Sequence, residues 1–430
     1  MSNALHLFIK SSFFSYAGKI ARLLFGIIYV YLIANYFGPE QYGSVSYLLN
    51  LAGLIALLVG NEAISETINV FTAKTKSTKV FTTLLKVQIA LAIASFLLFL
   101  VLGPLFIGAT EKASVELTLW ASGIVLLSPA SFLFPALFGG LKQFGKVLKL
   151  SFLESLINLL LAIAFVFLWP LGLLGIILAK IGSLTIFTWA AWAYFKKTTV
   201  QEIPIDTQEI KKYLINSIKF NFLKKGQTQI NVLLFGIFVQ TTSLGFYYLV
   251  EKISTNFIEM PLNALNEVML TFASEKGTDT KVLENYISFL LKLSLGVAVL
   301  FSISLGLLGP ILITVLFPAF AGGIVLIPFF ILINLTTAFR PLTIIFKSTN
   351  QVQVLTQGYT ITILFTLIGG SIAGIMYGLA GILGISALSN ALFFGFLYWN
   401  VKKMKFKLKI VPAKSDWTFL INHFKQAKKE

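Results

Sequence analysis

The sequence predicts an all-α integral membrane protein with twelve transmembrane helices in two parallel six-helix repeats. Three observations support this fold class: long apolar runs, a charge asymmetry between alternate loops, and an internal repeat. Hydrophobic residues make up 57% of the 430 residues and charged residues only 12%, whereas a soluble domain carries about 25% charged residues. The apolar residues form continuous runs, and a helix needs about 20 such residues to cross a bilayer.

The apolar runs place each predicted helix along the chain. The first run is not followed by the small-residue cleavage site of a signal peptide, so we interpret it as the first transmembrane helix. The predicted helices cover residues 13–36, 42–71, 83–107, 115–139, 150–168, 173–195, 213–239, 243–272, 286–317, 323–346, 352–377 and 379–401.

The loops between these helices predict the orientation. One alternate set is rich in Lys, whereas the other has Lys112 as its clear cation, accompanied by Glu40, Glu111 and Glu116. Because Lys and Arg accumulate in cytoplasmic loops, we expect the first set and both termini in the cytoplasm, which requires an even number of helices. The cytoplasmic set contains Lys74, Lys76, Lys79, Lys142, Lys146, Lys149, Lys196, Lys197, Lys211, Lys212, Lys276, Lys281, Lys347 and the tail from Lys402 to Lys429.

An internal repeat divides the chain into two halves. Five sequence elements recur at the same separation of 206 positions, and such regularity is the signature of a duplicated architecture. The matched pairs are Leu84-Leu85-Lys86 with Leu290-Leu291-Lys292, Gly103-Pro104 with Gly309-Pro310, Pro135 with Pro341, Gly172-Leu173-x-Gly175-Ile176 with Gly378-Leu379-x-Gly381-Ile382, and Lys196-Lys197 with Lys402-Lys403. Near the first helix pair the separation changes, since Gly43 matches Gly245 at 202 positions.

The repeat predicts the organisation of the chain. Six helices return the chain to the same side of the membrane, so the halves are expected to be parallel, with the substrate site between them. The predicted parts are an N-terminal six-helix lobe at 1–200, a cytoplasmic linker at 201–212, a C-terminal six-helix lobe at 213–401 and a basic cytoplasmic tail at 402–430.

The composition argues against several kinds of chemistry. The chain has no Cys, and its two His residues, His6 and His423, lie near the ends of the sequence, so we expect no metal site and no cofactor. A net charge of +17 would suggest nucleic acid in a soluble protein, but basic cytoplasmic loops account for it here. The outer loops are short and lack clustered acids or His, which favours a transporter over a membrane glycosyltransferase or polymerase.

Five basic residues inside predicted helices are candidates for a cationic substrate-binding cavity: Lys19, Arg22, Lys180, Lys225 and Arg340. An ionisable residue within the membrane costs several kcal/mol unless it faces a cavity or a partner. Lys19 and Arg22 share a helix face because they are three residues apart. Such a cavity would suit a pyrophosphate or an acidic sugar. The alternative for lysines near helix ends is that the ammonium reaches the membrane interface.

Two acidic residues, Glu62 and Glu66, are candidates for ion coupling. They are four residues apart on the second predicted helix, so they share a face. One interpretation is an ion pair with Arg22 or Lys19. The other is that one of the two takes up a proton and couples its movement to transport. Weaker candidates of the same kind are Glu154, Glu251, Glu259 and Glu267.

The turn Ala34-Asn35-Tyr36-Phe37-Gly38-Pro39-Glu40-Gln41-Tyr42-Gly43 carries a family resemblance. Together with the early Lys and Arg and the long second helix, it resembles the Wzx-type polysaccharide flippases of the multidrug/oligosaccharidyl-lipid/polysaccharide (MOP) exporter superfamily. The resemblance covers essentially the whole chain in length, helix number and division into halves. The second half departs from it, because Gln240-Thr241-Thr242-Ser243-Leu244-Gly245 keeps only the Gly.

This resemblance implies two MATE-like, V-shaped lobes in the bacterial inner membrane. It implies that the lobes move an undecaprenyl-pyrophosphate-linked oligosaccharide from the cytoplasmic to the periplasmic leaflet with ion coupling, and that Lys19 and Arg22 line a cationic cavity. The implied partners are this lipid-linked oligosaccharide, membrane lipids and the polymerase of the pathway, without nucleic acid. The pathway itself (O-antigen, capsule or exopolysaccharide) stays open.

Two other transporters remain alternatives. A MATE-like multidrug antiporter usually carries cationic substrates, which the basic residues would repel. A peptidoglycan lipid-precursor flippase carries a similar pyrophosphate lipid, but members of that family typically have two further helices.

Overall fold

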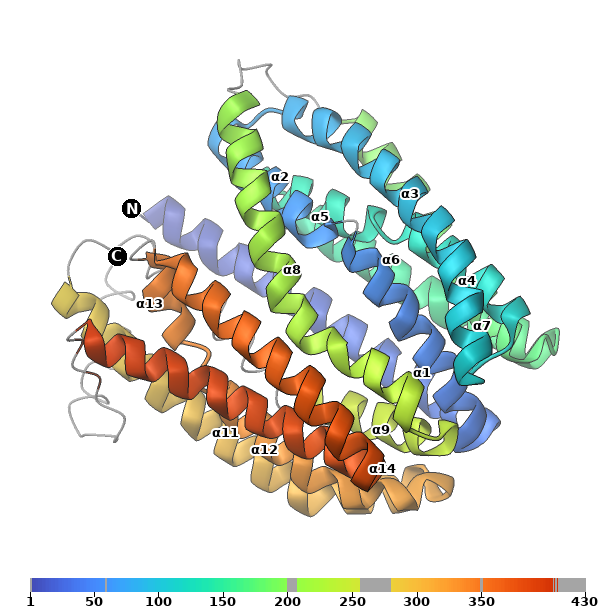
Figure 1. The fold of residues 1–430 in the computed structure, drawn as a ribbon. Coiled ribbons are helices and arrows are strands. Elements are labelled where there is room, and N and C mark those ends of the chain that lie inside the picture. Colours follow the sequence, from blue (N-terminus) through green and yellow to red (C-terminus); the bar gives the residue numbers. More distant parts are fainter. Residues whose placement is uncertain are drawn as a thin grey trace. The chain divides into compact units, whose positions relative to one another are not determined.

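A computed structural model describes residues 2–58, 60–198, 207–255, 280–348 and 351–404, together with residues 406 and 408. Within these ranges every regular element is a helix, as Figure 1 shows. Eight of the described helical stretches are long and apolar enough to cross a membrane. The all-helical, membrane-spanning class is therefore confirmed, whereas the total of twelve helices stays a prediction.

The described residues form two compact units. The N-terminal unit spans Phe13–Leu249, and the C-terminal unit joins Met1–Ser12 to Val250–Glu430. The predicted lobe boundaries stay a prediction. The helices from α1 to α9 are α1 Ser2–Leu58, α2 Asn61–Thr75, α3 Lys79–Thr110, α4 Val115–Leu127, α5 Ala130–Gly140, α6 Phe144–Ile163, the π-helix η1 Ala164–Leu168, α7 Gly172–Lys196, α8 Thr207–Phe238 and α9 Thr241–Ser254. The later helices are α11 Thr280–Leu316, the 3₁₀-helix η3 Pro318–Leu326, α12 Ile327–Thr337, α13 Leu342–Ser348 and α14 Val352–Lys403.

Two very long helices each contain one non-helical glycine. Gly38 (φ 70°, ψ 178°) interrupts α1, and Gly378 (φ 56°, ψ −134°) interrupts α14. Glycine adopts positive φ without the steric cost of a Cβ, so a single residue can join two helical arms. The arms correspond to predicted helices 13–36 and 42–71 in α1, and to 352–377 and 379–401 in α14.

One predicted helix is interrupted in the structure, and two others change their hydrogen-bonding pattern within a single apolar span. The predicted helix 42–71 breaks before Asn61, where Gly60 takes a left-handed conformation (φ 67°, ψ 24°). The predicted helix 115–139 is one span, Val115–Gly140, in which Ser128 and Pro129 keep right-handed helical dihedral angles between α4 and α5. The predicted helix 323–346 becomes part of η3 followed by α12 and α13, with a turn at residues 338–341. Hydropathy records burial in lipid but not backbone conformation, so it does not reveal such breaks.

The two repeat-related hairpin turns share their local geometry. Gly172 has a φ of 60°, and Gly378, 206 positions later, has a φ of 56°. Three residues after each of them lies a second glycine, Gly175 or Gly381. A Cβ at either position would collide with a backbone carbonyl, that of Phe165 or of Ala373. The matched motif therefore has the same structural purpose in both halves: a tight turn followed by close backbone packing.

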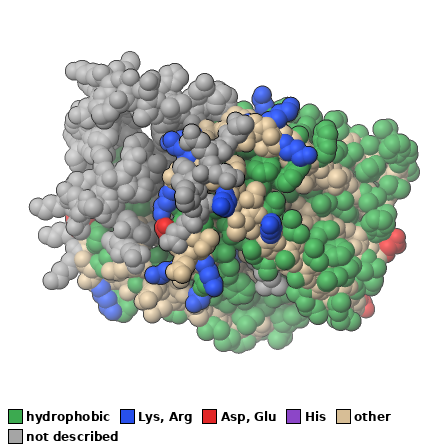
Figure 2. Space-filling view, turned by 90° about the horizontal axis from the view of Figure 1, so that it is seen from above, with side chains coloured by type: hydrophobic (Ala, Val, Ile, Leu, Met, Phe, Trp, Pro, Cys, Tyr) green, Lys and Arg blue, Asp and Glu red, His purple; other side chains and the backbone are tan. Residues whose placement is uncertain are grey.

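The core of the N-terminal unit is rich in aromatic residues. Phe81, Phe134, Phe138 and Phe187, from α3, α5 and α7, are all buried in one hydrophobic cluster. Many large apolar side chains of the outer helices are exposed instead, such as Leu105 of α3, and such extensive exposure is expected on a surface that contacts lipid. On the face shown in Figure 2, hydrophobic side chains cover one end of the described surface, and Lys and Arg side chains gather away from that end.

Candidate functional site

The break between α1 and α2 creates a helix N-terminus within the predicted second transmembrane segment. Described helical residues end at Leu58 and resume at Asn61, with Gly60 as the N-cap and no side-chain cap. The first N–H groups of a helix lack intrahelical acceptors, and the helix dipole adds partial positive charge there. The first turn of α2 contains an acidic residue, Glu62, as the dipole favours.

An ion pair joins this helix start to α8. The Lys225 ammonium lies 2.7 Å from a carboxylate oxygen of Glu62. The two side chains are 33% and 27% exposed, respectively, so a solute can reach the pair. Lys225 is 18 residues from the start of α8, which is about 27 Å along a helix. The pair therefore lies far from the end of α8, and Lys225 does not need to reach a helix end to find a partner.

Glu66 contacts the same helix one turn further along α2. The Asn221 amide donates a hydrogen bond of 2.9 Å to one carboxylate oxygen, and the Tyr213 hydroxyl donates one of 3.3 Å to the other. Both ion-coupling candidates thus face α8. Sequence reasoning gave Arg22 or Lys19 as partners, but the partner that the structure describes for Glu62 is Lys225.

A buried amide pair supports the first turn of α2. The Gln88 side-chain amide of α3 donates a 2.7 Å hydrogen bond to the Asn61 side-chain oxygen Oδ1, and both residues are almost fully buried. The Gln88 side-chain oxygen has no hydrogen-bond partner among the described residues. Sequence reasoning missed both amides. Two sequence features could have identified them: each is a polar residue inside an apolar run, and Gly60 directly precedes Asn61.

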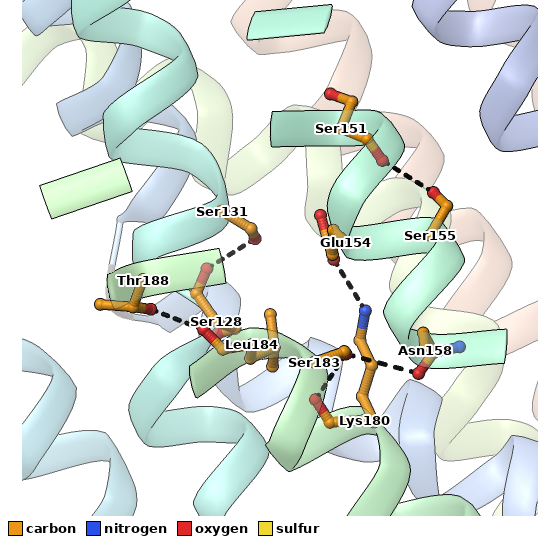
Figure 3. A network of polar contacts seen from close by, with 10 residues as sticks. All are labelled: Ser128, Ser131, Ser151, Glu154, Ser155, Asn158, Lys180, Ser183, Leu184 and Thr188. Atoms are coloured by element: carbon orange, nitrogen blue, oxygen red, sulfur yellow. Dashed lines mark hydrogen bonds and ion pairs between the residues drawn. The ribbon is translucent and has the colours of Figure 1, made fainter. Parts of the chain in front are cut away.

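A second ion pair lies between α6 and α7. The Lys180 ammonium is 3.0 Å from a carboxylate oxygen of Glu154. The Glu154 side chain is 11% exposed and that of Lys180 is 35% exposed. One helical turn away, the Ser183 hydroxyl lies 3.4 Å from the Asn158 side-chain oxygen; Figure 3 shows the four side chains converging between the two helices. Lys180, predicted to line a cavity, is therefore held by a carboxylate.

The remaining candidates have different positions. Lys19 and Arg22 belong to α1, but their side chains lie outside the described part of the structure. Arg340 lies in the turn between α12 and α13, half-buried, where its carbonyl oxygen accepts a 2.8 Å hydrogen bond from Thr343. Glu251 lies on α9, whereas the weaker candidates Glu259 and Glu267 lie outside the described residues.

Metal binding finds no support in the described ranges, where no group of three or more His, Cys, Asp or Glu could hold an ion. The charged groups that the structure does bring together are carboxylate–ammonium pairs.

A glycine crossing joins α1 to the first turns of α9. A Cβ on Gly43 would collide with backbone atoms of Thr241 and Gly245, and a Cβ on Gly245 would collide with the backbone of Pro39. A Cβ on Gly236 would collide with the Tyr47 hydroxyl. Only residues without a side chain permit this approach. Gly43 and Gly245 are the same two glycines that the predicted repeat matches at 202 positions.

Comparison with known proteins supports this architecture. A family model described as "Polysaccharide biosynthesis protein" matches residues 8–269. No curated protein matches the sequence significantly.

Solved structures with very low sequence identity share the fold. An inward-facing multidrug resistance MATE family transporter of the MOP superfamily has a TM-score of 0.70 at 15% identity, covering 89% of this chain and 95% of that one. The lipid II flippase MurJ in an inward closed conformation has a TM-score of 0.71 at 15% identity, covering 91% and 87%. A MOP superfamily transporter from Pyrococcus furiosus has a TM-score of 0.69 at 14% identity, covering 93% and 96%.

Proposed function

Because the chain belongs to the polysaccharide biosynthesis protein family, we propose that it flips an undecaprenyl-pyrophosphate-linked oligosaccharide from the cytoplasmic to the periplasmic leaflet. The family that the first turn predicted is confirmed by the family match, and the MOP-type fold by the solved structures. The observation that carries the proposal is the broken start of α2 with Lys225 beside it. The polysaccharide would be destined for the cell surface.

The broken helix offers two kinds of group for a pyrophosphate. The free N–H groups at the start of α2 favour an anion, and discontinuous membrane helices in transporters direct such ends toward anionic substrates. The Lys225 ammonium adds a charge-assisted hydrogen bond. Lys19 and Arg22, Lys180 and Arg340 are further proposed contributors to the cationic lining.

Glu62 competes with the substrate for Lys225. Without substrate, the carboxylate neutralises the ammonium at 2.7 Å. A bound pyrophosphate takes over Lys225 and leaves Glu62 without its partner, and the carboxylate then takes up a proton from the aqueous side to which it is open. When the substrate leaves, the proton is released and the ion pair forms again. This exchange would couple proton movement to transport, with Glu66 held ready on the same face by Asn221 and Tyr213.

The glycine crossing at Gly43 and Gly245 gives the repeats a close contact about which rocking could occur. Alternating access in transporters with internal repeats is largely rocking of one repeat against the other. The lysine-rich turns and tail would face the cytoplasm, with both termini, in the inner membrane of a bacterium. The pathway polymerase is the proposed protein partner.

A MATE-like multidrug antiporter is the second candidate, and the shared fold favours it. A cationic drug would be repelled by Lys225 unless Glu62 were the group that bound it. A peptidoglycan lipid-precursor flippase is the third candidate, and the fold of a lipid II flippase favours it. It would use the same pyrophosphate recognition with a different sugar.

The test uses the purified full-length chain in liposomes that contain a fluorescent undecaprenyl-pyrophosphoryl oligosaccharide. We expect faster leaflet exchange than in protein-free liposomes, with a dependence on an imposed proton gradient. Lys225→Gln should abolish most of the exchange, whereas Lys219→Gln, at an exposed position on the same helix, should retain it. An absence of exchange under any proton or sodium gradient, together with gradient-driven uptake of a cationic dye, would favour the antiporter.

A further inference from the structure

A groove of about 700 Å³ lies on the N-terminal unit between the first half of α6 and the last turns of α7. Each helix contributes one lysine to its lining, Lys149 from α6 and Lys197 at the end of α7. Aromatic side chains from both helices, Phe152, Trp189 and Tyr194, line it as well. Aliphatic side chains complete the lining: Leu148, Leu153, Ala190 and Ala193.

The two lysines of the groove are available to a ligand. Both residues are exposed, and neither ammonium has an acidic partner among the residues that the structure describes. Their neighbour Lys146 differs, because its ammonium donates a 3.0 Å hydrogen bond to Thr198 and lies 5.2 Å from the centre of the Phe138 ring. Lys149 and Lys197 therefore leave two exposed positive charges at the groove.

The depth of these residues matches the layers of a membrane. Lys149 is in the second turn of α6, and Lys197 directly follows α7, so both ammonium groups lie where the helices reach the headgroup layer. Trp189 is eight residues before Lys197, about 12 Å deeper along the helix. The Trp189 side chain is 74% exposed and that of Phe152 is 42% exposed. Charge at the surface and exposed aromatic area below it suit an amphiphile.

We propose that this groove binds an anionic phospholipid of the surrounding membrane. Its phosphate lies between Lys149 and Lys197, where each ammonium can donate a charge-assisted hydrogen bond. Its acyl chains lie along Phe152 and Trp189. Basic pockets between transmembrane helices are a known form of anionic lipid site. The proposal is independent of the transported substrate, since the groove is separate from the pair formed by Glu62 and Lys225.

The corresponding region of the second repeat arranges its side chains differently, with Gly358 and Gly395 in place of Phe152 and Trp189. At 206 positions after Ala190 and Ala193 are Phe396 and Trp399, and after Lys149 is Leu355. The Phe396 ring lies against Gly358, where a Cβ would be only 3.2 Å from it. The ammonium of Lys403 lies 3.4 Å from the centre of the Trp399 ring. The second repeat thus places aromatic rings where the first has alanines, so the lipid site is a property of the first repeat.

The test measures lipid binding by the purified full-length chain in detergent, using native mass spectrometry and thermal unfolding. The probes are phosphatidylglycerol, phosphatidylcholine with the same acyl chains, glycerol phosphate and undecaprenyl phosphate. Two variants attack the groove in different ways: Lys149→Gln with Lys197→Gln removes its charge, and Ala193→Trp fills it as in the second repeat. The matched control is Lys211→Gln with Lys212→Gln, which removes two charges from exposed positions at the start of α8.

The wild-type chain should retain phosphatidylglycerol more strongly than the other three probes. Neutralising a lysine near a lipid surface should weaken binding about fivefold, so the charge variant should lose roughly 25-fold. Ala193→Trp should weaken binding although every charge remains. Equal loss in the Lys211 and Lys212 control, or unchanged binding in Ala193→Trp, would overturn the proposal. Preference for glycerol phosphate or undecaprenyl phosphate would overturn it as well, since the site would then serve a soluble anion or the transported lipid.

Discussion

The α6–α7 hairpin of the N-terminal unit and the two arms of α14 in the C-terminal unit are counterparts at a separation of 206 positions. Each turns at a glycine with positive φ, Gly172 or Gly378. Each packs its helices across a second glycine three residues later. The polar groups between the helices differ. The first hairpin holds Glu154 against Lys180 at 3.0 Å, and the second has no charge at these positions, which are Thr360 and Ser386.

The second hairpin holds together through neutral groups. The Thr366 hydroxyl donates a 2.8 Å hydrogen bond to the Ser389 hydroxyl, which in turn donates one of 3.2 Å to the carbonyl of Thr362. The rings of Tyr359 and Phe393 stack across the same interface with centroids 4.5 Å apart. Ser389 is the counterpart of Ser183, so both hairpins have a serine hydroxyl at this position.

This difference shows that the hairpin does not need a charge pair to pack. The attraction within a buried ion pair often fails to offset the free-energy cost of removing both charges from water. Such a pair is therefore weak evidence for stabilisation. Charges in a membrane helix without a structural need are by default functional. We therefore propose that Glu154 and Lys180 serve transport rather than the stability of the fold.

The largest expected effect comes from removing one member of the pair. Glu154→Ala leaves the Lys180 ammonium without its partner between two helices. We expect the free energy of unfolding to fall by roughly 2–3 kcal/mol, below the cost for a fully buried pair because Lys180 is 35% exposed. Equilibrium unfolding in detergent measures this. Thr360→Ala, at the counterpart position, should lose less than about 0.5 kcal/mol; equal losses would contradict the comparison.

Next in size are substitutions that test the shared turn. Gly175→Ala and Gly381→Ala should each destabilise by about 1–3 kcal/mol, because the new methyl group meets a backbone carbonyl that cannot move aside easily. Thermal unfolding of both variants would measure the change. Gly145→Ala in α6 is the control, since a Cβ there meets open space. Stabilisation of all three variants by helix propensity alone would show that the close packing is not shared.

A smaller effect is expected within the neutral hairpin. Thr366→Val keeps the shape of the side chain and removes the hydroxyl that bonds to Ser389. We expect a loss of about 1 kcal/mol, the usual net contribution of one hydrogen bond. Denaturant unfolding is the measurement. If Thr366→Val lowered the free energy of unfolding as much as Glu154→Ala, neutral and charged contacts would contribute equally to stability.

The smallest effect on stability, and the most informative for function, comes from exchanging the charged pair for its counterpart. The double variant Glu154→Thr with Lys180→Ser removes both charges, so no ion is left unpaired. We expect unfolding free energy within about 1 kcal/mol of wild type and a reduced rate of leaflet exchange in the liposome assay. A variant that transports normally would assign the pair to the scaffold.

Much of the fold follows from local patterns in the sequence. The apolar runs indicated the membrane helices, and the gaps between the predicted helices at Gly172 and Gly378 coincide with the turns of the two hairpins. The break at Gly60 was missed, because a broken helix and a continuous one have the same hydropathy. The polar pair of Asn61 and Gln88 was missed for a related reason: a single amide in an apolar run shows no periodicity.

The candidate site residues show the same contrast between what local sequence patterns reveal and what the packing of helices decides. Sequence alone placed Lys180 and Lys225 within helices, since a bilayer imposes a length of about 20 apolar residues on every helix and makes each charged interruption conspicuous. It also determined that Glu62 and Glu66 share a face, because helical spacing is local. Only the tertiary structure decided that Glu62 meets Lys225 and that Lys180 meets Glu154. These partners lie 163 and 26 residues apart (225 − 62 and 180 − 154), and which charges meet depends on which helices pack, which neither hydropathy nor periodicity specifies.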